Sequence, residues 1–209
     1  MIDTAFLPEQ NKRAAILMRH ADRNSIANSG NEYEPLNELG IANSIEFGKK
    51  LTGYSAIKIF SSPYDRCIQT GKNILQGAHK TGAVSESEML GEPGPFVFDR
   101  DLAREIFRNI GPHGTVKNLI AGVELAGIRP LAEGCLLLKD FILSEINAAA
   151  GGTLLIFVTH DAIVAPFISF YTGEKFDKEN WTGFSDGAII IKDEENLQMI
   201  RNGKTHAMC

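Results

Sequence analysis

Three clusters of cationic and titratable residues each follow an apolar run that predicts a buried β-strand. They come directly after the runs 14–18, 56–60 and 153–158, and they read Arg19-His20-Ala21-Asp22-Arg23, Ser61-Ser62-Pro63-Tyr64-Asp65-Arg66 and Thr159-His160-Asp161. Parallel strands end at one edge of a sheet, where open α/β folds bind ligands, so we expect the clusters to converge. Three arginines and two histidines at one point suit a phosphate group, because guanidinium forks match its oxygens.

Each signal also has an ordinary structural explanation. A lone histidine after a strand is usually a buried structural residue, a single arginine is usually a solvated surface charge, and Asp161 could merely cap the following helix. Their joint occurrence after three separate strands favours a functional site. Ser62-Pro63 adds to it, because a capping hydroxyl followed by proline predicts a helix start whose free N–H groups attract anions.

These residues resemble the motifs of the histidine phosphatase superfamily, which includes phosphoglycerate mutases, acid phosphatases and phytases. The family's Arg-His-Gly corresponds to Arg19-His20-Ala21, its Ser-x-Pro-x-x-Arg-x-x-Gln-Thr motif to SSPYDRCIQT at 61–70, and its late histidine to His160. The run LNELG at 36–40 is similar to the family's approach to its first helix. The resemblance implies a phosphatase whose nucleophile is His20.

Two positions are similar to the acid phosphatase branch of this family. Arg23 stands where that branch has a second arginine, and Asp161 directly follows the late histidine, where that branch has its acidic proton donor. The mutase branch takes its proton donor from a glutamate in the lid region, and Glu92 is the nearest equivalent. We favour Asp161, because GEPGPF around Glu92 does not match that branch's motif. Ala21 replaces the family's glycine, which costs nothing if its φ is negative.

The resemblance implies covalent catalysis without a metal or another cofactor. His20 would attack phosphorus as neutral imidazole, with its other ring nitrogen donating to a carbonyl, and would form a phosphohistidine. Asp161 would protonate the leaving alkoxide and then accept a proton from water. The non-bridging oxygens would be neutralised by Arg19, Arg23, Arg66 and His160. The histidines and cysteines of the chain show no metal-ligand spacing.

Residues 91–130 predict a lid-like insertion, because six glycines and four prolines interrupt them. This lid is expected to choose the substrate. Its expected contacts with the substrate are Glu92, Arg104 and Arg108, and Trp181 and residues 31–34 could line the mouth, with Trp181 stacking on a ring. The alternative is that the lid arginines are solvated while Phe96, Phe98 and Phe107 hold the lid down.

The alternation of strands and helices predicts an α/β fold: a three-layer α/β/α sandwich with a mainly parallel central sheet, in one domain over 1–209. Asn37 can cap the helix expected over 37–51, in which Ile41, Ile45, Gly48 and Leu51 fall at helical spacing. Pro166 should disturb the helix expected over 161–171, because it cannot donate a backbone hydrogen bond. The expected elements beyond the three strands are helices over 37–51, 131–147 and 161–171 and strands over 187–192 and 197–201.

Composition limits the partners. The formal net charge of −5 argues against nucleic acid or an anionic membrane as a partner. No apolar run approaches the roughly 18 residues that span a membrane. Three widely spaced cysteines indicate reduced thiols, so we expect a soluble cytoplasmic protein that binds a small phosphorylated substrate. A homodimer is left open.

Three functions compete at this stage. The first is a phosphomonoesterase acting on a small phosphorylated metabolite, such as a sugar phosphate. The second is a mutase or phosphotransferase that uses the same His20 but passes the phosphoryl group to an alcohol instead of water. The third is a non-catalytic phosphate-binding module, which is disfavoured because every expected catalytic position is filled.

Overall fold

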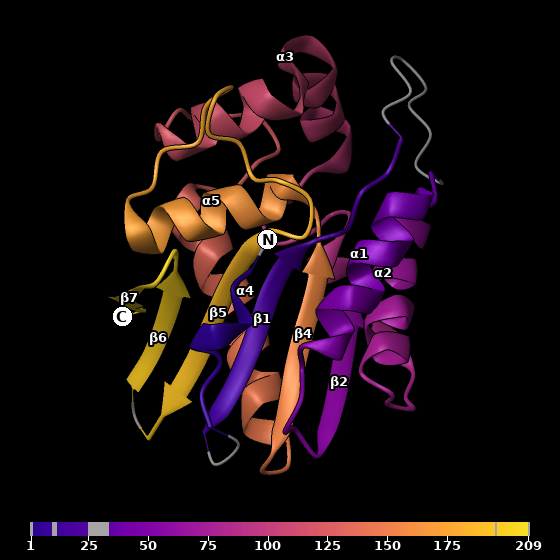
Figure 1. The fold of residues 1–209 in the computed structure, drawn as a ribbon. Coiled ribbons are helices and arrows are strands. Elements are labelled where there is room, and N and C mark those ends of the chain that lie inside the picture. Colours follow the sequence, from indigo (N-terminus) through magenta and orange to yellow (C-terminus); the bar gives the residue numbers. More distant parts are fainter. Residues whose placement is uncertain (1, 10–11, 25–33, 195, 209) are drawn as a thin grey trace.

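A computed structural model of the protein describes residues 2–9, 12–24, 34–194 and 196–208. These residues form a seven-stranded mixed sheet with helices around it (Figure 1). The strands are β1 (Arg13–Arg19), β2 (Ala56–Ser61), β3 (Val84–Glu86), β4 (Thr153–Thr159), β5 (Gly187–Asp193), β6 (Asn196–Arg201) and β7 (Lys204–Ala207). The helices are α1 (Glu38–Lys49), α2 (Asp65–Gly77), α3 (Arg100–Ile120), α4 (Leu131–Ala148) and α5 (Asp161–Thr172), with short 3-10 turns η1 (Thr4–Phe6) and η2 (Glu88–Leu90).

The strand order is β3-β2-β4-β1-β5-β6-β7. The first four of these strands run parallel to one another, whereas β5, β6 and β7 each run antiparallel to the strand before them. The predicted α/β fold with a parallel centre is confirmed. The sequence did not predict β3 and β7, because three and four residues are too few to show a periodicity.

Helices cover both faces of the sheet. In β1, Ala14, Ile16 and Met18 pack into the core beneath α1 and α2, while Ala15 and Leu17 face the core under α4 and α5. Successive side chains of a strand point to opposite faces, so a strand covered on both sides must be apolar at every position. This double burial explains the unbroken apolar runs of β1 and β4.

The backbones of α1 and α2 are almost in contact. A Cβ atom added to Gly48 would lie 2.2 Å from the carbonyl oxygen of Ile74, and one added to Gly77 would lie 2.0 Å from that of Ile45. The predicted side of this helix is confirmed in part: Gly48 and Leu51, just after the end of α1, are buried, but Ile41 is 40% exposed. The buried positions within α1 are Gly40, Ser44, Phe47 and Gly48.

Three helix features test the predicted boundaries. Asn37 caps α1 as predicted, accepting the N–H of Gly40 at 2.8 Å. The prediction that α2 starts at Pro63 is wrong, because α2 begins at Asp65 and the hydroxyl of Ser62 bonds to His160 rather than capping the helix. The predicted disturbance at Pro166 is also not seen: α5 continues through it as one helix, where residues 163–169 are buried in the core.

The segment 91–130 contributes no strand to the sheet. Its main element is α3, which lies beyond the edge at which β1 and β4 end (Figure 1). Gly111, with a φ of 70°, and Pro112 divide α3 into two halves. The function of the segment as a lid stays a prediction. In the part of the chain that the structure describes, no helix combines the length and apolar character that crossing a bilayer requires.

Candidate active site

The three predicted clusters meet at one edge of the sheet. Strand β4 lies between β1 and β2, all three run parallel, and the register pairs Arg19 with Thr159 and Ser61 with Val158. The rings of the two following histidines, His20 and His160, lie with their centroids 5.6 Å apart. The predicted convergence of the clusters is therefore confirmed.

His20 is buried and its ring is fixed in one tautomer. Nδ1 lies 2.8 Å from the carbonyl oxygen of Ala21, and a carbonyl can only accept, so Nδ1 carries the proton and Nε2 keeps its lone pair. Burial above all, and then the proximity of His160, Arg66 and Arg19, hold the pKa of His20 well below its usual range. The imidazole is therefore neutral at neutral pH, as a nucleophile requires.

The backbone around His20 is held by three parts of the chain. The N–H of His20 donates to Thr159 O at 2.9 Å, that of Ala21 to Thr70 Oγ1 at 3.0 Å, and that of Ser185 to His20 O at 3.2 Å. The described residues other than glycine that have a positive φ are His79, Ser185, Glu194 and Asn202. Ala21 therefore has a negative φ, and alanine in place of the family's glycine carries no strain.

Arg19 connects the end of β1 with the loop before β5. Its NH2 lies 3.0 Å from Asp161 Oδ2, and its NH1 donates to the carbonyl oxygen of Thr182 at 2.5 Å. Its guanidinium also lies over the ring of Phe184, 4.3 Å from the centroid. These contacts hold the charge of Arg19 beside the carboxylate of Asp161.

Arg66 and Arg23 bring two further positive charges. NH2 of Arg66 donates to His160 Nδ1 at 3.2 Å, and the Arg66 guanidinium lies 4.8 Å from the Tyr64 ring centroid. Arg23 forms an ion pair with the buried carboxylate of Glu34. Arg23, Arg66, His160 and Asp161 line one cavity.

Two donors of this cluster are poised for an anion. The Nε–H groups of Arg19 and Arg23 are buried and donate no hydrogen bond to any described residue. Most buried donors in proteins have a partner, because an unpaired buried N–H is costly. An oxyanion between these arginines would satisfy both donors and offset the accumulated positive charge.

His160 is held between two side chains. Its Nδ1 accepts from Arg66, so the proton of the neutral ring is on Nε2, which donates to Ser62 Oγ at 2.8 Å. Burial and the guanidinium of Arg66 lower the pKa of His160 to about 3, so the ring is uncharged. Direct contact of His160 with a phosphate stays a prediction, and it requires the ring to exchange one of these two partners.

Asp161 is the first residue of α5 and not its cap, since His160 occupies the N-cap position. Its Oδ1 accepts the N–H of Ala162 at 2.9 Å, and its Oδ2 accepts the indole N–H of Trp181 at 3.0 Å. Burial alone would raise the pKa of Asp161, but Arg19, Trp181 and His160 lower it on balance. Asp161 is therefore ionised in this state of the site.

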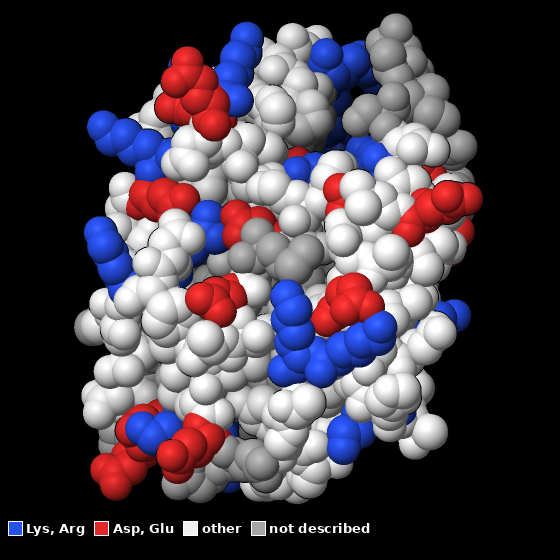
Figure 2. All heavy atoms as spheres, viewed as in Figure 1, with Lys and Arg blue, Asp and Glu red and all other residues white. Residues whose placement is uncertain are grey.

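A cavity of about 570 Å³ opens beside Asp161 and His160. Figure 2 shows Lys and Arg atoms within a hollow beside α3 at this end of the molecule. Glu92 and Arg104 line the cavity and form an ion pair at 3.4 Å, and Tyr64 OH donates to Glu92 at 3.2 Å. The apolar part of the lining consists of Pro93, Pro95, Phe96, Val97, Ala103, Phe107, Pro112, Ala162 and Ile163.

The other predicted substrate contacts are placed differently. Arg108 is exposed on α3 and does not line this cavity. Trp181 does not line it either, and its indole is occupied by Asp161 and by the ring of His113. Residues 31–33 lie outside the described part of the chain, and Glu34 pairs with Arg23.

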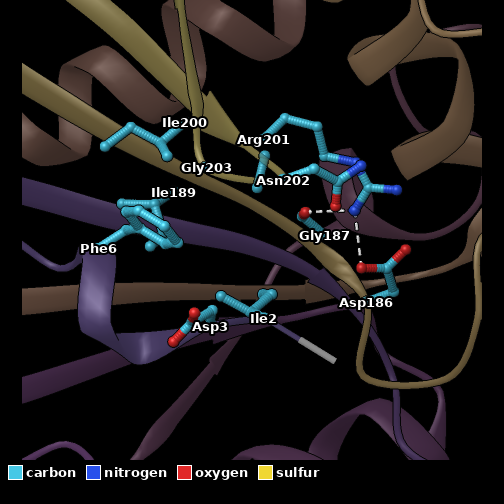
Figure 3. A pocket seen from close by; sticks show the side chains of 11 residues that line it. Ile2, Asp3, Phe6, Asp186, Gly187, Ile189, Ile200, Arg201, Asn202 and Gly203 are labelled. Atoms are coloured by element: carbon cyan, nitrogen blue, oxygen red, sulfur yellow. Dashed lines mark hydrogen bonds and ion pairs between the residues drawn. The ribbon is translucent and has the colours of Figure 1, made fainter.

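A second cavity, of about 280 Å³, lies beside the start of β5 and the end of β6. Its cation is Arg201, which bonds to the carboxylates of Asp186 at 2.7 Å and Glu174 at 2.9 Å (Figure 3 shows the contacts with Asp186 and Gly187). Two carboxylates already neutralise Arg201, so this cavity does not suit a phosphate. Arg201 instead anchors the loop that carries Trp181 and Phe184.

Sequence reasoning missed the contribution of this loop. Thr182, Phe184 and Ser185 contact Arg19 and His20 because β5 pairs antiparallel with β1, and the register Met18 to Gly187 brings the residues before β5 to the end of β1. Predicting the pairing of β5 with β1 would have found them. Within the described ranges, no group of three or more His, Cys, Asp or Glu residues is placed to hold a metal ion.

Part of the chain is similar to a known protein family. A family model described as the histidine phosphatase superfamily (branch 1) matches residues 15–93. The matched range contains the first two clusters and Glu92 and ends before His160 and Asp161. The similarity of Arg23 and Asp161 to the acid phosphatase branch stays a prediction. No curated protein matches the chain.

Solved structures share the fold. YhfR from Bacillus stearothermophilus is 16% identical, with 93% of this chain and 95% of that chain covered and a TM-score of 0.58. A mycobacterial glucosyl-3-phosphoglycerate phosphatase is 14% identical, with 86% and 89% covered and a TM-score of 0.55. A phosphoglycerate mutase from Bacillus anthracis is 15% identical, with 94% and 92% covered and a TM-score of 0.54. Similarity at this identity shows the fold alone.

Proposed function

We propose that this chain belongs to the histidine phosphatase superfamily and is a phosphomonoesterase that acts through a phosphohistidine on His20. The family-model match over residues 15–93 and the shared fold support the family. The observation that carries the proposal is the state of His20. A neutral, buried imidazole with a fixed Nδ1 proton stands near Arg19 and Arg23, whose buried Nε–H groups donate to no described residue. This arrangement combines an uncharged nucleophile with a binding site for an anion.

The proposed reaction has two steps. In the first, Nε2 of His20 bonds to phosphorus while the phosphorus–oxygen bond to the leaving group breaks, and Asp161 gives its proton to the leaving oxygen. In the second step, water attacks phosphorus, the phosphorus–nitrogen bond breaks, and Asp161 takes a proton from the water, so that phosphate is released. His20 keeps its Nδ1 proton on the carbonyl of Ala21 throughout and returns to the neutral form.

Asp161 must hold a proton in the first step, although Arg19 keeps it ionised in the site described above. A phosphate dianion is a stronger partner for Arg19 than a single carboxylate is. When Arg19 turns to the phosphate, the pKa of Asp161 rises and the carboxyl takes up a proton from solvent. Substrate binding thus prepares the acid that the reaction needs.

The leaving group is expected to occupy the cavity beside Asp161. Its volume of about 570 Å³ suits a small metabolite, and its lid side offers an ion pair, Arg104 with Glu92, on an otherwise largely apolar wall. Glu92 is also the alternative proton donor. If Glu92 filled that role and an alcohol replaced water, the same site would serve a mutase or phosphotransferase. A cytoplasmic location and catalysis without a metal belong to the same proposal.

The test is to trap the intermediate. Brief reaction with labelled phosphomonoester followed by alkaline denaturation should give a protein-bound phosphate that is stable to base and labile to acid, and His20→Asn should give none. Activity should survive EDTA, and vanadate should inhibit it by mimicking five-coordinate phosphorus. Hydrolysis that His20→Asn leaves intact, or that EDTA abolishes and magnesium restores, would overturn the proposal.

A further inference from the structure

Trp181 makes a specific contact with the proposed proton donor. It lies in the loop between α5 and β5, and its indole N–H donates to Asp161 Oδ2 at 3.0 Å. Arg19 NH2 is also 3.0 Å from Oδ2, while the backbone N–H of Ala162 holds Oδ1. Each oxygen of the carboxylate is therefore held by at least one donor.

The other side of the indole is packed against the segment 91–130. The centroid of the Trp181 ring lies 4.0 Å from that of His113, in the second half of α3, and 6.5 Å from that of Phe176. These two rings leave the indole little freedom to turn away from Asp161. Pro112, next to His113, lines the cavity beside Asp161.

Two side chains, Arg19 and Trp181, donate hydrogen bonds to Asp161, and a bound substrate would compete for them unequally. Arg19 is a cation beside the nucleophile, so a phosphate anion competes for it. The indole N–H is uncharged and belongs to a packed ring, so an anion has far less to gain from it. Of the two, Trp181 is the one that can hold Asp161 both before and after substrate binds.

We infer that Trp181 is a positioning residue that fixes the carboxyl group of Asp161 during proton transfer. The inference rests on the proposed function, in which Asp161 is the acid and base of the two steps. While Asp161 gives its proton to the leaving oxygen, the indole N–H stabilises the carboxylate that forms. When water attacks, the same hydrogen bond keeps that carboxylate in place to take the proton.

Trp181 is the only tryptophan of the chain, so its fluorescence reports on this contact without any need for activity. The titratable and charged groups that face the indole are Asp161 from α5, His113 from α3 and Arg19, which binds Asp161. The titration is therefore done in a His113→Phe background, which keeps a ring but removes its charge. We expect an acid transition in the emission that Asp161→Asn removes and Glu92→Gln keeps.

The kinetic test uses Trp181→Phe, which removes the N–H and keeps a smaller aromatic ring against His113. We expect kcat for an alkyl phosphate to fall about tenfold, the scale of one lost hydrogen bond to a charged group. The pH at which kcat falls on the alkaline side should rise, because the N–H favours the carboxylate. Hydrolysis of 4-nitrophenyl phosphate, whose leaving group needs no proton, should barely change, and so should inhibition by inorganic phosphate.

A double mutant distinguishes a failure of this inference from a failure of the proposed role of Asp161. In an Asp161→Asn background, Trp181→Phe should cost nothing further, because a residue that acts through Asp161 has nothing left to position. Equal losses on both substrates, an additive loss in the double mutant, or an emission transition that persists in Asp161→Asn would overturn the inference. If Asp161→Asn itself shows no dependence on the leaving group, the proposed acid fails instead, while the fluorescence result still decides whether the contact exists.

Discussion

At the scale of single residues, the site is an arrangement of paired charges that a substrate must rearrange. Arg19 is paired with Asp161, Arg23 with Glu34, and Arg66 with the neutral ring of His160. Each pairing offsets part of the cost of burying a cation next to two others. In the proposed reaction, a phosphate takes over some of these contacts, so its binding and proton transfer by Asp161 would be linked through the same side chains.

The proposed role of Asp161 as proton donor can be tested with substrates that differ in their leaving group. Asp161→Asn should slow hydrolysis of an alkyl phosphate by a factor of about 10²–10³ and hydrolysis of 4-nitrophenyl phosphate far less, because only the alkoxide needs a proton to leave. Steady-state rates on the two substrates measure the difference. Glu92→Gln is the matched control, and it should show no such dependence. The opposite result would place the acid on the lid side of the cavity.

The proposed contact between Arg23 and the phosphate can be tested by substitution. Arg23→Ala should lower kcat/KM by a factor of order 10²–10³, the scale for losing a charge contact to the transition state. Glu34→Gln removes the partner of Arg23 but keeps the guanidinium, so its loss should be much smaller. Thermal unfolding of both variants shows whether the fold is kept. Near-normal kinetics of a folded Arg23→Ala would show that Arg23 is a structural charge.

At the scale of elements, α3 sets one wall of the cavity. Arg104 lines the cavity, while Arg108, one turn further along, is exposed and outside the lining. Arg104→Ala should therefore raise KM for an anionic natural substrate by about tenfold, as expected for the loss of one charged contact, and should hardly affect a minimal aryl phosphate. Arg108→Ala serves as the control on the same helix. Equal effects of both variants on KM would contradict this division.

Elements were predictable where the pattern depends on local sequence. The runs of β1, β2 and β4 and the cap at Asn37 follow from apolar runs and from hydrogen-bonding side chains next to them. The packing of α1 on α2 was not predictable, because it depends on two glycines, Gly48 and Gly77, that meet across the helices rather than along one of them.

The candidate site shows the same division. The residues in the clusters after the strand ends, such as His20, Arg66 and His160, were found because parallel strands end together. The residues that hold them were missed. Ser62 was interpreted as a helix cap but bonds to His160, and Trp181 was interpreted as a substrate contact but bonds to Asp161. Such contacts depend on side-chain directions that a linear pattern does not contain.

At the scale of the whole molecule, two neutral histidines make stability depend on pH. His20 and His160 have lowered pKa values in the folded chain, about 3 for His160, against about 6.5 when unfolded. Between these values the unfolded chain binds protons that the folded chain does not, so stability is full above pH 6.5 and falls as the pH falls.

We expect the free energy of unfolding to fall below pH 6.5 by about 1.4 kcal/mol per pH unit for each of the two histidines. Denaturant unfolding between about pH 5.5 and 7 measures this slope, in a range where ordinary carboxylates are still ionised. His160→Asn should halve the slope whatever its effect on stability at neutral pH. A slope that the substitution leaves unchanged would show that His160 is protonated in the folded chain.

The position of β4 in the sheet also bears on how the protein assembles. Strand β4 follows β2 by about 100 residues in the sequence, yet it lies between β2 and β1 in the sheet and separates them. His20 and Arg66 therefore cannot take up their final distance until this late segment has been inserted. Contacts so distant in sequence make folding slow. During synthesis, the first half of the chain therefore leaves the ribosome with His20 and all three arginines of the proposed site, but the site cannot assemble until β4, the centre of the sheet, has been made.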